Sequence, residues 1–316
     1  MDQKTAENTL FIGNGFSRSV FRDMPSWDDL FEDVSIAIQD YTILYEAFLL
    51  EKKRQGLTED DVKKGLVEKI RAEFSGKSVK DDICDLEQFG HYMVQHHVNN
   101  ILTTNYDNGI EFILCEFCGY REQTPKNMVP ETIYSVRTYK LFVNDDTGHE
   151  VRLWKVHGDL KRVRSITLGF DQYCGSLSKL SEYVKGTYKS SKKDAKVECA
   201  GPMDIKCKEQ KFDQLSWAEL FFRTNIYIVG FGLNSSEIDI WWLLNKRARL
   251  MIDIPQIKNT ITYLYDERFE TPSQTSKNKN VKEKKAMFAA LDAFQVTYSP
   301  IISDSGYISN IFESML

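Results

Sequence analysis

Ile101-Leu102-Thr103-Thr104-Asn105-Tyr106-Asp107 is an apolar run that ends abruptly in polar residues, and a helical pattern follows it from Asn108 to about Tyr120. This order predicts a β-strand that feeds a helix through a polar turn. In an open α/β sheet, ligands bind at the carboxyl ends of the strands. We therefore expect the turn that contains Asn105 to lie at a ligand site.

Three other stretches have the same shape. They are Leu10-Phe11-Ile12-Gly13-Asn14-Gly15-Phe16-Ser17, Leu153-Trp154-Lys155-Val156-His157-Gly158-Asp159 and Ile226-Tyr227-Ile228-Val229-Gly230-Phe231-Gly232. Each places Gly, Asn, Asp, Ser or His directly after an apolar run. Because parallel strands end at one edge of their sheet, we expect the four turns to meet at one crevice.

Composition limits the class of protein. The chain has 316 residues, of which 42% are hydrophobic and 28% charged, enough for a sizeable core. The net charge of -5 argues against direct nucleic-acid binding. No apolar run is as long as the roughly 18 residues that a membrane-spanning helix needs. The polar N-terminus lacks the apolar segment of a signal peptide, so we expect a cytoplasmic protein.

The first strand is expected at residues 9–13, and a long helical region separates it from the second strand. Three amphipathic helices are predicted there, beginning near Trp27, Thr58 and Asp82, with Thr58 as an N-cap. This region is far longer than a simple crossover. It indicates a helical module, at about residues 27–99, inserted into a parallel sheet.

The rest of the chain alternates between strands and helices, which predicts an α/β fold with a mainly parallel sheet in one domain, residues 1–316. Residues 172–214 are polar and rich in Ser and Lys, so we expect a surface insertion, mobile near Tyr188–Glu198. Strands are expected at 139–143, 151–156, 165–170, 226–230, 260–265 and 296–298, the first two as a hairpin or a pair of adjacent strands. Helices are expected at 177–184, 214–224, 236–251 and 285–294.

The six cysteines are expected to be reduced thiols, as in other cytosolic proteins. Cys115 and Cys118 form a C-x-x-C pair inside the predicted helix after Asp107, where they share one face. A structural zinc site usually needs two such pairs, and the second is missing. We therefore interpret both as small buried residues and expect no metal.

Glycine pairs follow the first and the last of the four strands. At Gly13 and Gly15, a strand enters a helix, and glycine there lets the backbone approach a phosphate closely. Gly230 and Gly232 repeat the arrangement at a second strand end. Two such turns on one sheet favour a dinucleotide, although each is also compatible with a tight turn that binds nothing.

Polar residues at the other two strand ends supply candidate chemistry. Asn105 carries both donors and an acceptor, which suits a ribose hydroxyl or a water molecule. Asp107 is a candidate ligand-binding residue or only the N-cap of the next helix. His157 ends a strand and is a candidate general base near neutral pH, with a structural role as the alternative.

In this order, the motifs that contain Gly13–Ser17, Thr103–Asp107, Val156–Asp159 and Gly230–Leu233 resemble the sirtuin-like NAD-binding proteins. The nearest resemblance is to the sirtuin-like NADases of bacterial anti-phage defence. Sirtuins usually have Gly-Ala-Gly in the first motif and Thr-Gln-Asn-Ile-Asp in the second, and this chain departs from both. It also lacks the four-cysteine zinc module and the Pro-Asp-Phe-Arg stretch of the deacylases, which disfavours deacylation.

The resemblance implies a Rossmann-like sheet, NAD as the substrate, and catalytic roles for Asn105 and His157. Asn105 would position water or the nicotinamide ribose, and His157 would act near the ribose hydroxyls. Glu237 is an alternative to Asp239 at the adenosine ribose. The NAD-binding residues that the resemblance implies are Gly13, Asn14, Gly15, Phe16, Ser17, Thr104, Asp107, Gly230, Gly232 and Asp239.

The expected activity is hydrolysis of NAD to ADP-ribose and nicotinamide. Because uncontrolled NAD loss harms the cell, the resemblance further implies control through a homo-oligomer or through a partner such as a motor ATPase or phage-sensing subunit. Two other classes stay open. One is an NAD or ADP-ribose sensor without turnover, and the other is a protein ADP-ribosyl or deacyl transferase.

Overall fold

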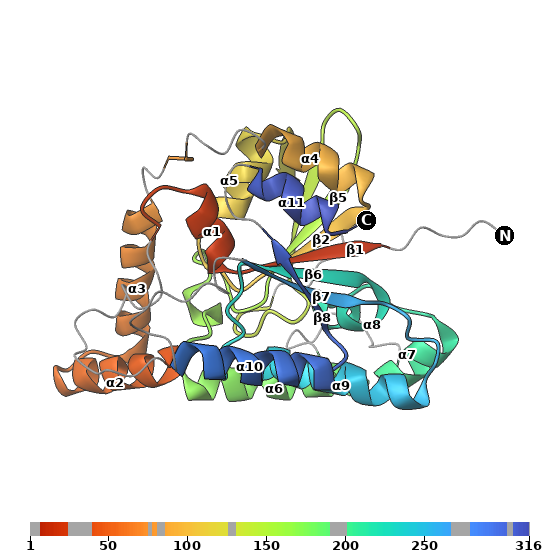
Figure 1. Ribbon diagram of the computed structural model, residues 1–316. Helices are drawn as coiled ribbons and strands as arrows, with labels where there is room; N and C mark the ends of the chain where they lie inside the picture. Colours follow the sequence, from red (N-terminus) through yellow and green to blue (C-terminus); the bar gives the residue numbers. More distant parts are fainter. Residues whose placement is uncertain are drawn as a thin grey trace.

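Short apolar runs form the strands of one mixed sheet (Figure 1). The computed structural model describes residues 7–24, 40–74, 78–80, 86–125, 131–189, 201–266, 279–301 and 306–315. The strands are β1 (Asn8–Ile12), β2 (Val98–Thr103), β3 (Tyr120–Gln123), β4 (Lys140–Asn144), β5 (Glu150–Lys155), β6 (Asn225–Val229), β7 (Ile261–Asp266) and β8 (Thr297–Ile301). Their order across the sheet is β3-β4-β5-β2-β1-β6-β7-β8.

The neighbours from β5 to β8 all pair in parallel, whereas β3, β4 and β5 pair antiparallel at one end. If only the parallel strands are numbered in chain order, the sequence across the sheet is 3-2-1-4-5-6. This is the order of a Rossmann-like α/β fold, and it confirms the predicted fold class. The order reverses between β1 and β6, where such sheets bind dinucleotides.

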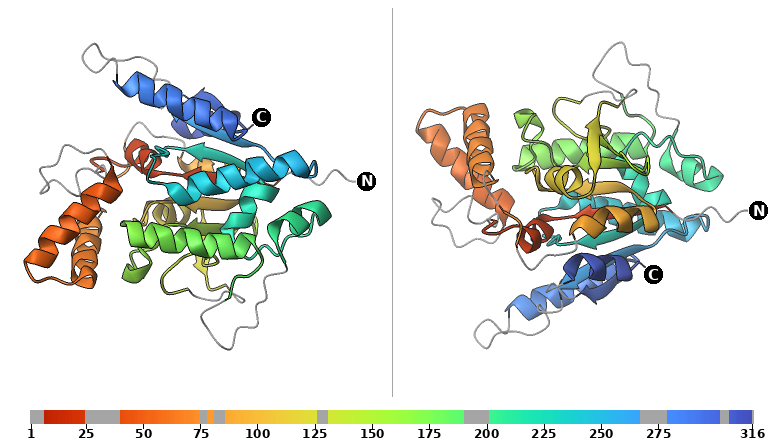
Figure 2. Two further views of the ribbon diagram at one scale, coloured as in Figure 1. Left: turned by 90° about the horizontal axis from the view of Figure 1, so that it is seen from below. Right: turned by 90° about the horizontal axis from the view of Figure 1, so that it is seen from above.

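Helices cover both faces of the sheet, with α4, α5 and α11 on one side and α6, α8, α9 and α10 on the other (Figures 1 and 2). The helices are α1 (Asn14–Val20), α2 (Tyr41–Arg54), α3 (Glu59–Phe74), α4 (Leu86–Gln95), α5 (Gly109–Glu116), α6 (Phe170–Val184), α7 (Met203–Glu209), α8 (Leu220–Arg223), α9 (Ile238–Asp253), α10 (Lys279–Ala293) and α11 (Tyr307–Glu313).

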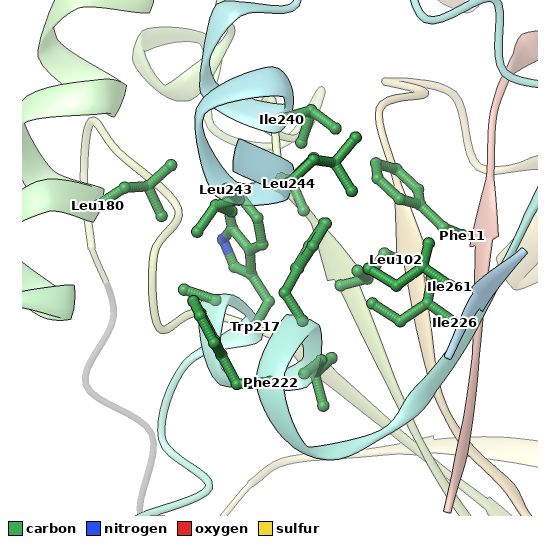
Figure 3. Packing of buried hydrophobic residues seen from close by; sticks show 14 of the residues in the cluster. Phe11, Leu102, Leu180, Trp217, Phe222, Ile226, Ile240, Leu243, Leu244 and Ile261 are labelled. Carbon is green, nitrogen blue, oxygen red and sulfur yellow. The ribbon is translucent and has the colours of Figure 1, made fainter. Parts of the chain in front are cut away.

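Alternation along the strands divides the core into two layers. In β1, Leu10 and Ile12 pack with α4, α5 and α11, and Phe11 points to the opposite face. Figure 3 shows Phe11 and Leu102 of β2 facing the α9 side chains, among them Leu244. Burying each side chain of this size stabilises the fold by about 1.5–3 kcal/mol. Residue alternation thereby fixes which helices each strand face contacts.

The first two helices of the predicted module begin at polar caps. Oδ1 of Asp40 accepts hydrogen bonds from the backbone N–H groups of Thr42 and Ile43, which starts α2. Thr58 Oγ1 accepts from the N–H of Asp61, whose carboxylate accepts from the N–H of Thr58 in return. The predicted N-cap at Thr58 is therefore confirmed.

One predicted strand is wrong. Residues 165–170 form no strand; the end of a 3-10 turn at Val163–Ser165 leads into a loop, and α6 starts at Phe170. The N–H of Thr167 donates to the carbonyl of His157 instead of to a neighbouring strand. Ile166 and Leu168 are buried, but against α2 and α3 and not in the sheet. Ile166 and Leu168 alternate with other residues, as in a strand, because both side chains pack into this separate cluster.

The helix expected to reach Tyr120 ends at Glu116. Phe117 is the C-cap of the helix, and Gly119, with a left-handed φ of +67°, then turns the chain into β3. No strand was predicted at these residues. Of the C-x-x-C pair, Cys118 is buried as expected, whereas Cys115 is exposed.

The predicted surface insertion at 172–214 contains two helices that reach the core. Leu180 of α6 and Met203 of α7 are completely buried. Of the stretch expected to be mobile, Tyr188 is buried, and residues 190–198 lie outside the described residues. Parts of the predicted helical module, residues 27–39, 75–77 and 82–85, also lie outside them.

Candidate functional site

The strand register brings the four motifs to one edge of the sheet. Ile12 pairs with Thr103 and with Val229, and Thr103 pairs with Lys155. The four strands therefore end at one level, and the turns that follow them emerge side by side. This is the edge at which open α/β sheets bind ligands.

The glycines of the first and last motifs pack against each other. A Cβ atom on Gly13 would lie 2.5 Å from the carbonyl oxygen of Gly230, and one on Gly15 would lie 2.8 Å from it. The N–H of Gly13 donates to Val229, and that of Gly15 donates to Gly230. These two N–H groups are thus used within the protein. Close contact between the turns explains the glycines without a phosphate.

The other predicted residues of these two motifs differ in their surroundings. Phe16 is buried, with its ring 6.1 Å from that of Phe89 and 6.0 Å from that of Tyr307, so it belongs to the core. Asn14 opens α1 and is partly exposed. Among the described residues, a Cβ on Gly232 would meet only Asn234, at 3.6 Å.

Asn105 is buried and joins the first two motifs. Its backbone N–H donates to Thr103 Oγ1, and its Nδ2 donates to Ser17 Oγ, both at 3.0 Å. Among the residues that the structure describes, its Oδ1 has no hydrogen-bond partner, although solvent does not reach it. Thr104 is buried beside it. A buried acceptor without a partner calls for an explanation, and a bound hydroxyl or water would supply the missing donor.

Asp107 shapes the turn that follows Asn105. Its Oδ1 accepts a hydrogen bond of 2.7 Å from the N–H of Gly109, the first residue of α5. Burial raises the pKa of its carboxyl group, and Lys155 partly opposes that shift. Asn108 is the N-cap of α5, yet Asp107 satisfies one free N–H of the helix. The structural alternative for Asp107 therefore has direct support.

The ring of His157 lies between two carboxylates. Its Nε2 is 3.1 and 3.3 Å from the two oxygens of Asp239, and its Nδ1 is 3.5 Å from Oε2 of Glu237. All three residues are buried. The resemblance implied a role at the adenosine ribose for Asp239 or Glu237, and in the structure both face His157. The cue in the sequence was the Glu-x-Asp spacing shortly after the last glycine motif.

Helix α6 holds the two carboxylates from the other side. Tyr173 donates from its hydroxyl to Oε2 of Glu237 at 3.3 Å, and Ser176 donates to Oδ2 of Asp239 at 3.2 Å. Residues three apart lie on one helix face, so α6 presents both donors together. The sequence missed them because this part of the chain was interpreted as a surface insertion.

The cluster keeps His157 protonated at neutral pH. Burial alone would lower the pKa of His157, but Asp239 and Glu237 together outweigh burial and raise it to about 9. Burial would raise the pKa of Asp239, yet His157 and its hydrogen bonds keep it below the ordinary range. A charged imidazole donates and cannot accept a proton. The predicted role of His157 as a general base therefore does not suit this arrangement.

His157, Glu237 and Asp239 have the residue types of a metal site, and one ligand atom from each lies within 4.8 Å of the others. The ring, however, presents a different nitrogen to each carboxylate. A single ion binds only one nitrogen of an imidazole ring, in its neutral form. The geometry instead fits a doubly protonated ring that donates on both sides.

Lys155, which the sequence assigned only to a strand, ties the Asn105 turn to the His157 strand. Its Nζ donates to the backbone carbonyl oxygens of Tyr106, at 3.2 Å, and of Asp107, and lies 2.8 Å from Oε1 of Glu111. Lys155 is buried. A buried ammonium group needs such a set of acceptors, because an unpaired charge there is very unfavourable.

The α2–α3 hairpin covers this edge of the sheet. Its apolar side chains pack on Tyr106 and on Leu160, Ile166 and Leu168 of the loop after His157. Arg71 of α3 also donates to the carbonyl of Leu160 at 2.7 Å. The hairpin thus rests on the two turns that carry Asn105 and His157.

We expect the ring of His157 to carry both protons at pH 7 and to lose one near pH 9. NMR of the ring nitrogens, with the His157 signals assigned by comparison with His157→Gln, measures this pKa. Asp239→Asn should lower the pKa of His157. Because folding raises this pKa above 6.5, the charged ring stabilises the fold fully below pH 6.5 and progressively less up to about 9. If the ring instead titrates below pH 6.5, Asp239 and Glu237 do not hold His157 in its charged form.

Comparison of the chain with models of known protein families and with curated proteins gives no match. Among the helices of the described ranges, none combines the length and the apolar character needed to cross a membrane. The function is therefore inferred from the residues of the site.

Proposed function

We propose that this protein hydrolyses NAD at the bond between nicotinamide and ribose, releasing nicotinamide and ADP-ribose. The observation that carries the proposal is the buried, unpartnered Oδ1 of Asn105 at the carboxyl edge of the sheet. The strand order, which reverses beside it, is the order that binds dinucleotides. The sirtuin-like motifs supply the reaction type, since fold alone does not imply function.

The residues of the site have different roles, which follow from the hydrogen bonds that each can donate or accept. Oδ1 of Asn105 is suited to accept from a ribose hydroxyl or from the attacking water. Both N–H groups of protonated His157 are directed at Asp239 and Glu237, so His157 is suited to hold these two carboxylates in position. As the glycosidic bond lengthens, positive charge grows on the ribose ring. The carboxylates of Glu237 and Asp239 lower the cost of that charge in a buried site.

We further propose that the activity is controlled, as an effector of anti-phage defence by NAD depletion would require. Control would come from assembly of identical chains or from a partner such as a motor ATPase or a phage-sensing subunit. This part of the proposal rests on the resemblance alone. The assay below is therefore run over a wide range of protein concentration, so that assembly is sampled.

The purified chain is expected to convert NAD to nicotinamide and ADP-ribose, as measured by chromatography. Asn105→Ala and His157→Ala should each reduce turnover by about 100-fold or more, the usual effect of removing a group that stabilises or orients the reacting atoms. Asn99→Ala, at the start of β2, and His91→Ala, on the exposed face of α4, are the matched controls and should retain turnover.

Other results would point elsewhere. NAD that binds without turnover at any protein concentration would favour the sensor. ADP-ribose found on protein by mass spectrometry would favour the transferase. Unchanged turnover in both Asn105→Ala and His157→Ala would show that the site lies elsewhere.

A further inference from the structure

Glu237 is the member of the His157 cluster that reaches toward solvent. Its side chain is 12% exposed, against 2% for His157 and 0% for Asp239. It is the N-cap residue of α9, directly after the turn that carries the last glycine motif. Its contacts with His157 and Tyr173 both use Oε2. Among the described residues, its other oxygen is the cluster's best-placed acceptor for an incoming molecule.

Asp239, by contrast, is fully committed within the protein. Its Oδ1 accepts from the N–H of Ile240 at 2.9 Å, and its Oδ2 accepts from Ser176. Both oxygens also contact Nε2 of His157. No solvent reaches this carboxylate. It can orient and charge His157, but it has no free side to offer a substrate.

We propose that Glu237, and not His157, accepts the proton of the attacking water, and that Asp239 is a positioning residue that keeps His157 a donor. This inference rests on the function proposed above and assigns its proton acceptor. Carboxylates serve as bases in glycoside hydrolysis, the same class of bond breaking. The division between an acid form and a base form in neighbouring groups is typical of such sites.

The bond between the anomeric carbon and the nicotinamide nitrogen breaks, and its electron pair stays on nitrogen, which neutralises the pyridinium. The water oxygen bonds to the same carbon. One water proton passes to the carboxylate of Glu237, which later releases it to solvent.

The charges around Glu237 suit this role. His157 and Asp239 face it within the cluster, Tyr173 faces it from α6, and Tyr106 and Asp40 lie near enough to interact with it. Burial raises its pKa to about 7, partly offset by His157. A base works best when its pKa lies near the working pH. Turnover should therefore rise with pH through about 7 as Glu237 ionises.

The test compares Glu237→Gln with the wild-type chain and with Glu182→Gln, a control at a half-buried position of α6. We expect Glu237→Gln to lower kcat by about 100-fold or more. It should still bind NAD in calorimetry, and the rise of kcat/KM with pH should disappear. Added formate should restore turnover to Glu237→Ala but not to His157→Ala, because a small carboxylate can replace a missing base.

The outcomes separate this inference from the proposed function. If the wild-type chain hydrolyses NAD and Glu237→Gln keeps its kcat and its pH dependence, the inference is overturned and the NADase stands. The inference is also overturned if the rise with pH is lost only in His157→Gln. A wild-type chain that never turns over NAD overturns the proposed function together with the inference.

Discussion

Replacing Lys155 with methionine is expected to lower the free energy of unfolding by about 3–5 kcal/mol, because it removes one partner of a buried ion pair. Lys155 is 3% exposed, and its ammonium group contacts Glu111 and two backbone carbonyl oxygens of the Asn105 turn. Methionine has a similar volume and no charge, so it leaves these acceptors without a donor. The turn should then loosen, and activity should fall with stability.

Urea unfolding measures the effect of Lys155→Met, and Lys179→Met is its matched control. Lys179 pairs with Glu182 on the surface, where their side chains are 36% and 34% exposed. Removing that charge should change stability by less than about 0.5 kcal/mol. If both variants unfold at the same urea concentration as the wild type, Lys155 does not hold the turn. Lys140, which also contacts Glu111, would then be sufficient.

Gly230→Ala is expected to destabilise the protein by about 2–5 kcal/mol, the sum of left-handed backbone strain and overpacking. Gly230 has a φ of +61°, and an added Cβ would lie 2.1 Å from the backbone nitrogen of Phe16. Backbone atoms cannot move aside as a flexible side chain can. The β1 and β6 turns would therefore separate, and NAD binding should weaken with them. Thermal unfolding and calorimetric titration measure the two effects.

Variants at two other glycines separate the effect of backbone strain from the effect of overpacking. Gly232→Ala meets only Asn234, at 3.6 Å, and should change stability by less than about 1 kcal/mol. Gly148 has a φ of +69° with nothing within 4 Å, so Gly148→Ala reports the backbone strain alone. A Gly230→Ala variant no less stable than Gly148→Ala would show that the two turns do not need their close contact.

The sequence predicted the sheet and the meeting of its four turns because these depend on local patterns. A short apolar run followed by glycine or polar residues marks a buried strand and the turn after it, as at Leu10–Gly13. Because β1 and β2 are neighbours in the sheet, Asn105 lies beside Ser17. The hydrogen bond between them joins two predicted motifs. Each of these inferences needed only neighbours in the chain and a general rule for parallel sheets.

The surroundings of His157 could not be predicted in this way. Asp239 lies 82 residues further along the chain, and no local pattern couples the two. Lys155 has the spacing of a strand residue, so its buried contacts with the Asn105 turn had no signal either. Ile166 and Leu168 alternate as in a strand, yet they pack against the α2–α3 hairpin. Such contacts arise only when separate elements are brought together in space.

The α2–α3 hairpin has a consequence for how tightly any ligand is held. Consider a molecule whose binding next to Asn105 requires displacement of the contacts that the hairpin makes with Tyr106 and the loop after His157. Its measured dissociation constant is then the intrinsic constant divided by the fraction of molecules with the hairpin displaced. Anything that binds the outer side of the hairpin and holds it away would raise affinity without touching the ligand. The α2–α3 hairpin thereby competes with the ligand for the site. A second molecule that binds the hairpin can change how strongly it competes.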